Sequence, residues 1–123
     1  MNTIRTLLLL VTAISPALHA ETCSVSEKDI LGAWGKDGEQ GYFDEFSLDT
    51  DSDTHVFNSW IDHRPEISGA GWEIKDCQLL ISGRYNEFPP FQLKIIGLKE
   101  ERLRLYDEED SLEWVYKRIS KRP

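Results

Sequence analysis

The sequence is poor in the residues that most catalytic and metal sites need. It has two cysteines and three histidines in 123 residues, with no Cys-x-x-Cys pair and no two histidines at the spacing of metal ligands. It also has no glycine-rich phosphate loop and no nucleophile elbow. Because these motifs are absent, the sequence offers no evidence for a catalytic site. We therefore expect a protein that is not an enzyme and that needs no metal or cofactor.

Basic residues are in the minority. Lysine and arginine number 14 against 22 aspartates and glutamates, which gives a formal net charge of −8. Binding to phosphates needs a basic face, so the composition argues against a nucleic-acid partner and disfavours an anionic membrane surface. The complementary partner is a basic protein, although a strong net charge also serves solubility.

The longest apolar run lies near the N-terminus and is too short to cross a bilayer. Residues 1–20 combine Arg5, the apolar run Leu7–Val11 and a final Ala20, a pattern typical of a secretory signal peptide that is cleaved after Ala20. The residues before Cys23 lack the small side chain that a lipid-attachment site needs. We therefore expect a soluble periplasmic or secreted protein without a membrane anchor.

The chain from residue 21 to residue 123 has the length of one small domain with a single hydrophobic core. Two cysteines in an exported chain suggest one disulfide, Cys23–Cys77. Closing a loop of that length stabilises the fold by about 4 kcal/mol. We expect this domain to be a monomer.

Helical periodicity is missing after residue 31, whereas apolar and polar residues alternate to the C-terminus. Glycine, proline and aspartate fall where the alternation breaks, as they do in turns. Strands are expected at residues 33–37, 41–48, 54–61, 66–74, 78–84, 90–97, 102–106 and 112–119. This pattern predicts an all-β fold, a small eight-stranded antiparallel up-and-down barrel, with an open β-sandwich as the alternative.

The residues expected to face the interior are mostly bulky and apolar. They are Phe46, Leu48, Val56, Trp60, Trp72, Ile74, Leu79, Ile81, Leu93, Ile95, Leu103, Leu105, Trp114 and Tyr116. A small barrel holds only its own side chains or one small ligand. We expect a mostly filled interior with at most a slot at the mouth opposite Trp34.

The two ends of the chain carry groups suited to sealing one end of such a barrel. Ser26 to Asp29 is typical of a capped helical turn. Gly32 allows a close backbone approach, and Trp34 supplies a large apolar plate. The last strand delivers Arg118, whose guanidinium can lie over the indole.

Gly32-x-Trp34 near the start, the meander of short strands and the closing Tyr116-x-Arg118 resemble the small bacterial lipocalin-like (calycin-type) barrel proteins. The resemblance covers nearly all of the chain after residue 20. It implies that Trp34 and Arg118 close the base of the barrel, and that the protein binds a small apolar or amphipathic ligand. The residues that would line or cover the ligand slot are Trp60, Trp72, Phe88 and Phe91.

The segment Phe88-Pro89-Pro90-Phe91 joins two stiff prolines to two aromatic rings. Such a segment suits a lid over the mouth or a contact surface, and it equally suits a packed crossover.

The densest charge is the run Asp107, Glu108, Glu109 and Asp110. This run is either a solvated turn or a docking tip for a basic partner. The docking interpretation leads to a second functional hypothesis, an acidic periplasmic inhibitor or immunity-type protein that binds a basic enzyme or toxin, in the manner of periplasmic lysozyme inhibitors. Charge, size and compartment carry it.

Two other features are expected to be ordinary surface. Residues 49–53 begin like a calcium loop, but Thr54 and Trp60 replace the glycine and glutamate that the loop requires. His55 and His63 would lie about 26 Å apart along one strand, too far to share a metal.

Overall fold

Eight strands follow the alternating pattern along the chain. The computed structural model describes residues 23–83 and 88–119, and the predicted signal peptide lies outside them. The elements are α1 (Glu27–Ile30), β1 (Gly32–Lys36), β2 (Tyr42–Asp49), β3 (Thr54–Ile61), β4 (Arg64–Lys75), β5 (Gln78–Ser82), β6 (Phe91–Lys99), β7 (Arg102–Asp107) and β8 (Leu112–Ile119). The predicted strands are confirmed to within a few residues at their ends. In the described part of the chain, no helix has the length and apolarity needed to cross a membrane.

The strands form a closed barrel in which each strand pairs antiparallel with its neighbours in the sequence. The barrel closes where β1 pairs with β8, with Trp34 opposite Arg118 and Lys36 opposite Tyr116. The up-and-down barrel is therefore confirmed, and the alternative of an open sandwich is wrong.

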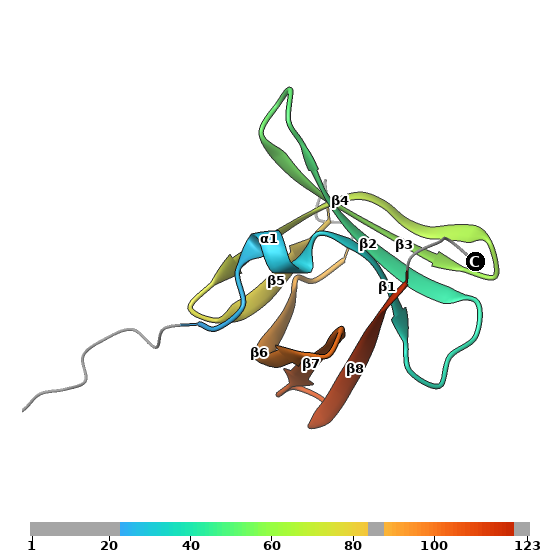
Figure 1. Ribbon diagram of the computed structural model, residues 1–123. Helices are drawn as coiled ribbons and strands as arrows, with labels where there is room; N and C mark the ends of the chain where they lie inside the picture. Colours follow the sequence, from blue (N-terminus) through green and yellow to red (C-terminus); the bar gives the residue numbers. More distant parts are fainter. Residues whose placement is uncertain (1–22, 84–87, 120–123) are drawn as a thin grey trace, which may run out of the picture.

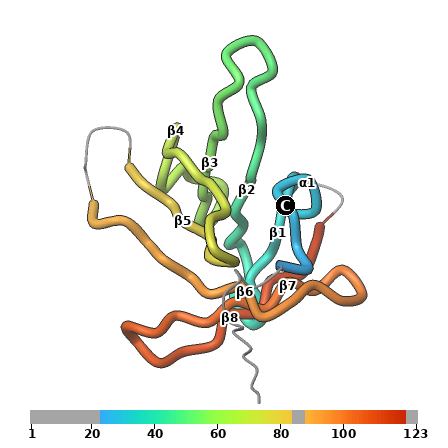
Figure 2. Tube along the Cα trace, turned by 90° about the vertical axis from the view of Figure 1, so that its left-hand side faces the viewer, coloured from blue at the N-terminus to red at the C-terminus, as the bar shows by residue number. Residues whose placement is uncertain are grey.

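The two ends of this barrel differ. Residues 23–31, including α1, lie across one end, which we call the plug end (Figure 1). Because neighbouring strands run antiparallel, the turns β2–β3, β4–β5 and β6–β7 lie at the same end. The β2–β3 hairpin projects beyond the body of the barrel (Figure 2). The turns β1–β2, β3–β4 and β7–β8 lie at the opposite end, which we call the open end.

The plug is tied down by two long side chains. Trp34 is fully buried, and its indole N–H donates to the Ile30 carbonyl at 2.8 Å. The Arg118 guanidinium lies 4.2 Å from the centre of the Trp34 ring and donates to the carbonyls of Leu31 (2.8 Å) and Asp29 (2.7 Å). These bonds satisfy carbonyls that the end of a helix leaves without intrahelical partners.

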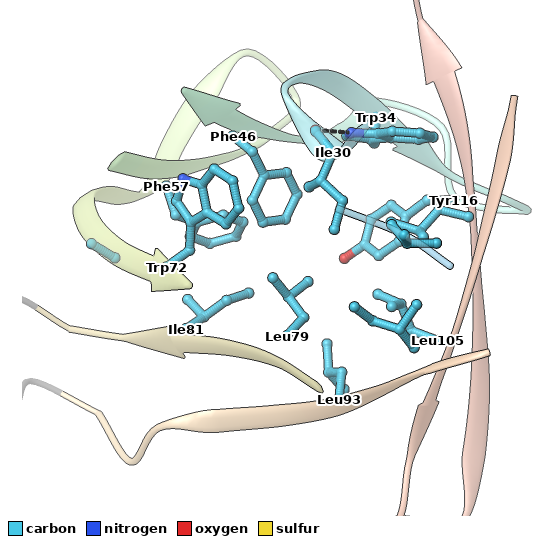
Figure 3. Packing of buried hydrophobic residues seen from close by; sticks show 14 residues of the cluster. Ile30, Trp34, Phe46, Phe57, Trp72, Leu79, Ile81, Leu93, Leu105 and Tyr116 are labelled. Carbon is cyan, nitrogen blue, oxygen red and sulfur yellow. Dashed lines mark hydrogen bonds between the residues drawn. The ribbon is translucent and has the colours of Figure 1, made fainter. Parts of the chain in front are cut away.

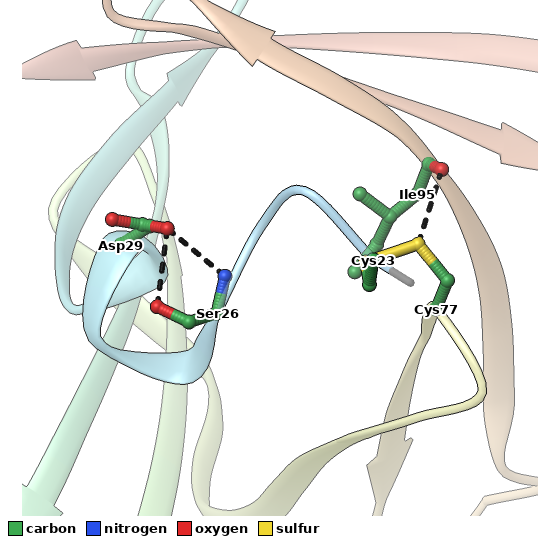
Figure 4. Close-up of a disulfide and its surroundings, with 5 residues drawn as sticks. All are labelled: Cys23, Ser26, Asp29, Cys77 and Ile95. Carbon is green, nitrogen blue, oxygen red and sulfur yellow. Dashed lines mark hydrogen bonds between the residues drawn. A yellow bond between two sulfur atoms is a disulfide. The ribbon is translucent and has the colours of Figure 1, made fainter. Parts of the chain in front are cut away.

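A disulfide joins Cys23 to Cys77, 54 residues away, and so holds the N-terminal segment against the turn before β5 (Figure 4). The following turn of helix is capped by Asp29, whose carboxylate accepts from the Ser26 amide at 2.9 Å and the Ser26 hydroxyl at 3.1 Å. These hydrogen bonds lower the pKa of Asp29. The disulfide indicates that the protein folds in an oxidising compartment.

Apolar side chains fill the barrel from the plug end to its middle (Figure 3). The buried members of this core are Val25, Ile30, Trp34, Phe46, Phe57, Ala70, Trp72, Leu79, Ile81, Leu93, Ile95, Leu103, Leu105 and Tyr116. Ile74 and Trp114 pack against the core but are only partly buried. This part of the barrel is occupied by its own side chains.

The prediction that Val56 and Trp60 face the interior is wrong. The buried residues of β3 are Phe57 and Ser59. Phe57 lies opposite Phe46, and the two rings are 5.0 Å apart. Strands present side chains to alternate faces, so placing Phe57 inside turns Val56 and Trp60 outward.

Trp60 and Leu48 both lie away from the core. Trp60 stacks on Phe43 on the outer face, with ring centres 4.6 Å apart and planes 8° from parallel. Leu48, also expected inside, is 38% exposed because it lies on the projecting β2–β3 hairpin. In β3, Val56 and Phe57 are apolar residues at consecutive positions, so alternation alone did not decide which of them faces the interior.

Candidate functional site at the open end

The interior of the open end is polar, in contrast to the core below it. Asp44, Ser59 and Asp107 are the buried polar or charged residues of the described chain. Each shares a face with core residues of its own strand: Asp44 lies two residues from Phe46, and Ser59 two from Phe57. The interior of the barrel therefore changes from apolar to polar between one inward-facing residue of a strand and the next.

Asp44 is the centre of this polar region. It is only 1% exposed, and its Oδ2 accepts from the hydroxyls of Tyr116 (2.5 Å) and Tyr42 (3.2 Å). Its Oδ1 has no hydrogen-bond partner among the described residues. Burial raises the pKa of Asp44, and the hydroxyls of Tyr116, Ser59 and Tyr42 oppose that rise because they stabilise the carboxylate.

The two tyrosines remain protonated under ordinary conditions. Burial raises the pKa of Tyr116 and of Tyr42 above the usual tyrosine value, and the nearby Asp44 charge raises both further. Both phenols therefore keep the proton that they donate to Asp44.

Lys36 covers the cluster from the end of β1. Its Nζ lies 4.4 Å from the centre of the Trp114 ring and 5.6 Å from that of Tyr42. The same Nζ forms an ion pair with Glu39 at 3.5 Å, and the Lys36 side chain is 23% exposed. The Trp114 indole N–H is buried and has no partner in residues 23–83 and 88–119. We call Lys36, Tyr42, Asp44, Trp114 and Tyr116 the inner cluster.

A second feature lies on the rim of the same end. Lys94 and Tyr106 are the last registered pair of β6 and β7 in this direction, so the strands diverge beyond them. The gap holds a pocket of about 140 Å³, which we call the rim pocket. Its lining includes Phe91, Gln92, Lys94, Asp107, Glu108 and Glu109.

The four acidic residues predicted as a docking tip divide into two groups. Asp107 is buried, and its Oδ1 accepts from the amides of Glu109 (3.1 Å) and Asp110 (3.2 Å), so it shapes the turn. Glu108, Glu109 and Asp110 are exposed. The structure places Glu108 and Glu109 beside Phe91, and so joins two sites that the sequence suggested separately.

The four aromatic residues expected to line one ligand slot do not lie together. Trp72 is buried in the core, edge-on to Phe46 at 5.3 Å, and Trp60 is on the outer face. Phe88 and Phe91 contact each other toward the open end, with ring centres 5.5 Å apart. Phe91 of this pair also lines the rim pocket.

Sequence reasoning did not single out the inner cluster. The available signal was that Lys36 and Asp44 occupy positions where the alternation set by Trp34 and Phe46 calls for apolar residues. A charge at an inward position needs polar partners, so two such charges on neighbouring strands were a signal of a polar cluster.

Comparison with known proteins finds no matching family model, no similar characterised protein and no similar solved structure. The class that the structure defines is therefore an eight-stranded antiparallel closed β-barrel with a polar open end. Within the described residues, no three metal-binding side chains lie close enough to hold an ion.

Proposed function

We propose that this protein is an exported, lipocalin-like binding module that docks a basic protein through its open end. The observation that carries the proposal is the rim pocket, where an aromatic ring and exposed carboxylates lie together. A disulfide suited to an oxidising compartment supports export.

The chemistry of the rim pocket matches a lysine or arginine side chain. Such a side chain has an apolar stem and a charged head. Phe91, 39% exposed, offers a surface for the stem, and Glu108 and Glu109 offer charge to the head. Leu112, 53% exposed in the same hairpin, adds an apolar contact at the tip. The net charge of −8 steers a basic partner toward the molecule.

The test reverses charge at one end of the barrel and compares it with the other end. Glu108→Lys with Glu109→Lys alters the rim, whereas Asp51→Lys with Glu73→Lys makes the same change in net charge on exposed residues toward the plug end. Association with lysozyme, used as a basic probe protein, is measured by stopped flow at about 20 and 150 mM salt.

The rim variant should associate at least about tenfold more slowly at low salt, because steering depends on local charge. The control variant should change the rate by less than about threefold. Equal effects of the two variants, or no effect of either, would show that the rim does not direct docking.

The second candidate is a carrier of a small apolar ligand, and the contact between Phe88 and Phe91 toward the mouth favours it. A lipophilic naphthylamine dye should then bind saturably, and Phe91→Ala should abolish the binding. Ile96→Ala, which removes another exposed apolar side chain, should leave it unchanged. Dye binding that is absent, or that survives Phe91→Ala, contradicts this candidate.

A further inference from the structure

We propose that the inner cluster is a binding site for a primary alkylammonium group, and that the chain's own Lys36 occupies it. The site uses none of the rim-pocket residues, so it goes beyond the docking function proposed above.

The groups around the Lys36 ammonium are those that recognise amines. Two aromatic rings lie within cation–π distance of Nζ, at 4.4 Å for Trp114 and 5.6 Å for Tyr42. The hydroxyl of one of these rings, Tyr42, donates to the buried carboxylate of Asp44 at 3.2 Å. An ammonium group donates three hydrogen bonds, and Asp44 Oδ1 is an acceptor left open among the described residues.

The inner cluster is incomplete with Lys36 as its occupant. The salt bridges of the described chain include Lys36 with Glu39 but none between Lys36 and Asp44. Asp44 Oδ1, an acceptor, is buried without a partner in that part of the chain. The Trp114 indole N–H is also without a partner there, but it is a donor and an ammonium group cannot satisfy it. Buried polar atoms are normally satisfied. The Lys36 ammonium therefore occupies the site but leaves the Asp44 Oδ1 acceptor without a hydrogen bond.

Lys36 also has a partner outside the inner cluster. It is the last residue of β1, and its Nζ already contacts Glu39 in the following turn at 3.5 Å. Surface ion pairs of this kind differ little in free energy from solvated charges, by about 0–1 kcal/mol. An incoming ammonium can therefore displace Lys36 toward Glu39 at small cost.

The experiment opens the site and offers it a free amine. Lys36→Ala removes the internal occupant, and Lys36→Met keeps a long side chain over the rings without the charge. Each variant and the wild type are titrated with n-butylammonium chloride and followed by tryptophan fluorescence. Sodium chloride at equal ionic strength and n-butanol are the controls. Lys36→Ser is a second open variant if Lys36→Ala does not fold.

We expect the open variant to bind n-butylammonium saturably, at least about tenfold more tightly than the wild type, because the internal competitor is gone. Lys36→Met should not bind it. Adding Asp44→Asn to the open variant should remove the preference for n-butylammonium over n-butanol. Equal responses to amine and alcohol, or equal affinities of open variant and wild type, would overturn the proposal.

Two further arms identify the source of the amine and separate this site from the rim. A capped Gly-Lys-Gly peptide that binds the open variant points to a lysine of a partner, whereas binding of n-butylammonium alone points to a small amine. Glu108→Lys with Glu109→Lys, made in the open variant, should leave n-butylammonium binding unchanged. Loss of docking therefore cannot be confused with loss of the inner site.

Discussion

The two ends of the barrel differ in whether their buried polar groups have hydrogen-bond partners. At the plug end, the Trp34 indole N–H has a carbonyl partner, and Arg118 reaches two more. At the open end, Asp44 Oδ1 and Trp114 Nε1 are buried without a partner among the described residues. Unpaired buried groups cost stability. The comparison indicates that polar contacts at the plug end stabilise the fold, whereas the open end is where we propose that binding occurs.

The comparison is tested most strongly by the tryptophan at each end. Trp34→Ala should lower the free energy of unfolding by about 3–5 kcal/mol, because it empties a fully buried site. Trp114→Ala should cost about 1–2 kcal/mol, because that ring is only partly buried. Urea denaturation measures both. Equal losses would show that the two ends contribute alike to stability.

The disulfide gives the next largest effect. Replacing Cys23 and Cys77 together by alanine should lower the free energy of unfolding by about 2–4 kcal/mol, because the bridge restricts the unfolded chain. Wild-type protein unfolded in the presence of dithiothreitol should give the same value. An unchanged denaturation midpoint would mean that α1 and Arg118 hold the plug without the bridge.

Asp44 gives the smallest effect and acts at the open end. Its pKa is raised above the ordinary 3.8, so the folded protein binds a proton more readily than the unfolded chain. Its contribution to stability is therefore present below pH 3.8 and is lost as the pH rises through the folded pKa. Unfolding of the wild type and Asp44→Asn is compared from about pH 4 to pH 8.

As the pH rises, the free energy of unfolding of the wild type should fall relative to that of Asp44→Asn, because asparagine carries no charge to bury. Asp44→Ala is the control for lost hydrogen bonds, since it leaves two tyrosine hydroxyls without their acceptor and should cost about 1–3 kcal/mol. A difference between wild type and Asp44→Asn that does not vary with pH would contradict the raised pKa.

Local sequence signals predicted the strands, because period-two alternation and turn residues act over a few neighbouring positions. They did not decide which residues of β3 face the interior, because Val56, Phe57 and Trp60 offer apolar side chains to both faces. The choice of face was decided by the partner strand, through Phe46 opposite Phe57 and Phe43 opposite Trp60.

The inner cluster could not be predicted as a unit. Asp44 and Tyr116 are 72 residues apart and meet only because β1 pairs with both β2 and β8. The two segments that line the rim pocket, one acidic and one aromatic, could each be recognised in the sequence, but the pocket between them could not. Their proximity follows from the divergence of β6 and β7 beyond Lys94.

Pairing of β1 with β8 also sets the order in which the barrel can fold. Arg118 reaches the carbonyl of Leu31, 87 residues earlier, so the ring of strands is completed only when the last strand arrives. Such a distant contact must overcome a large loop-closure entropy, so we expect this pairing to form after the pairings between sequence neighbours. Until then the free backbone of β1 is a template for pairing with other chains, so loss of β8 should lead to aggregation and not to a smaller soluble barrel.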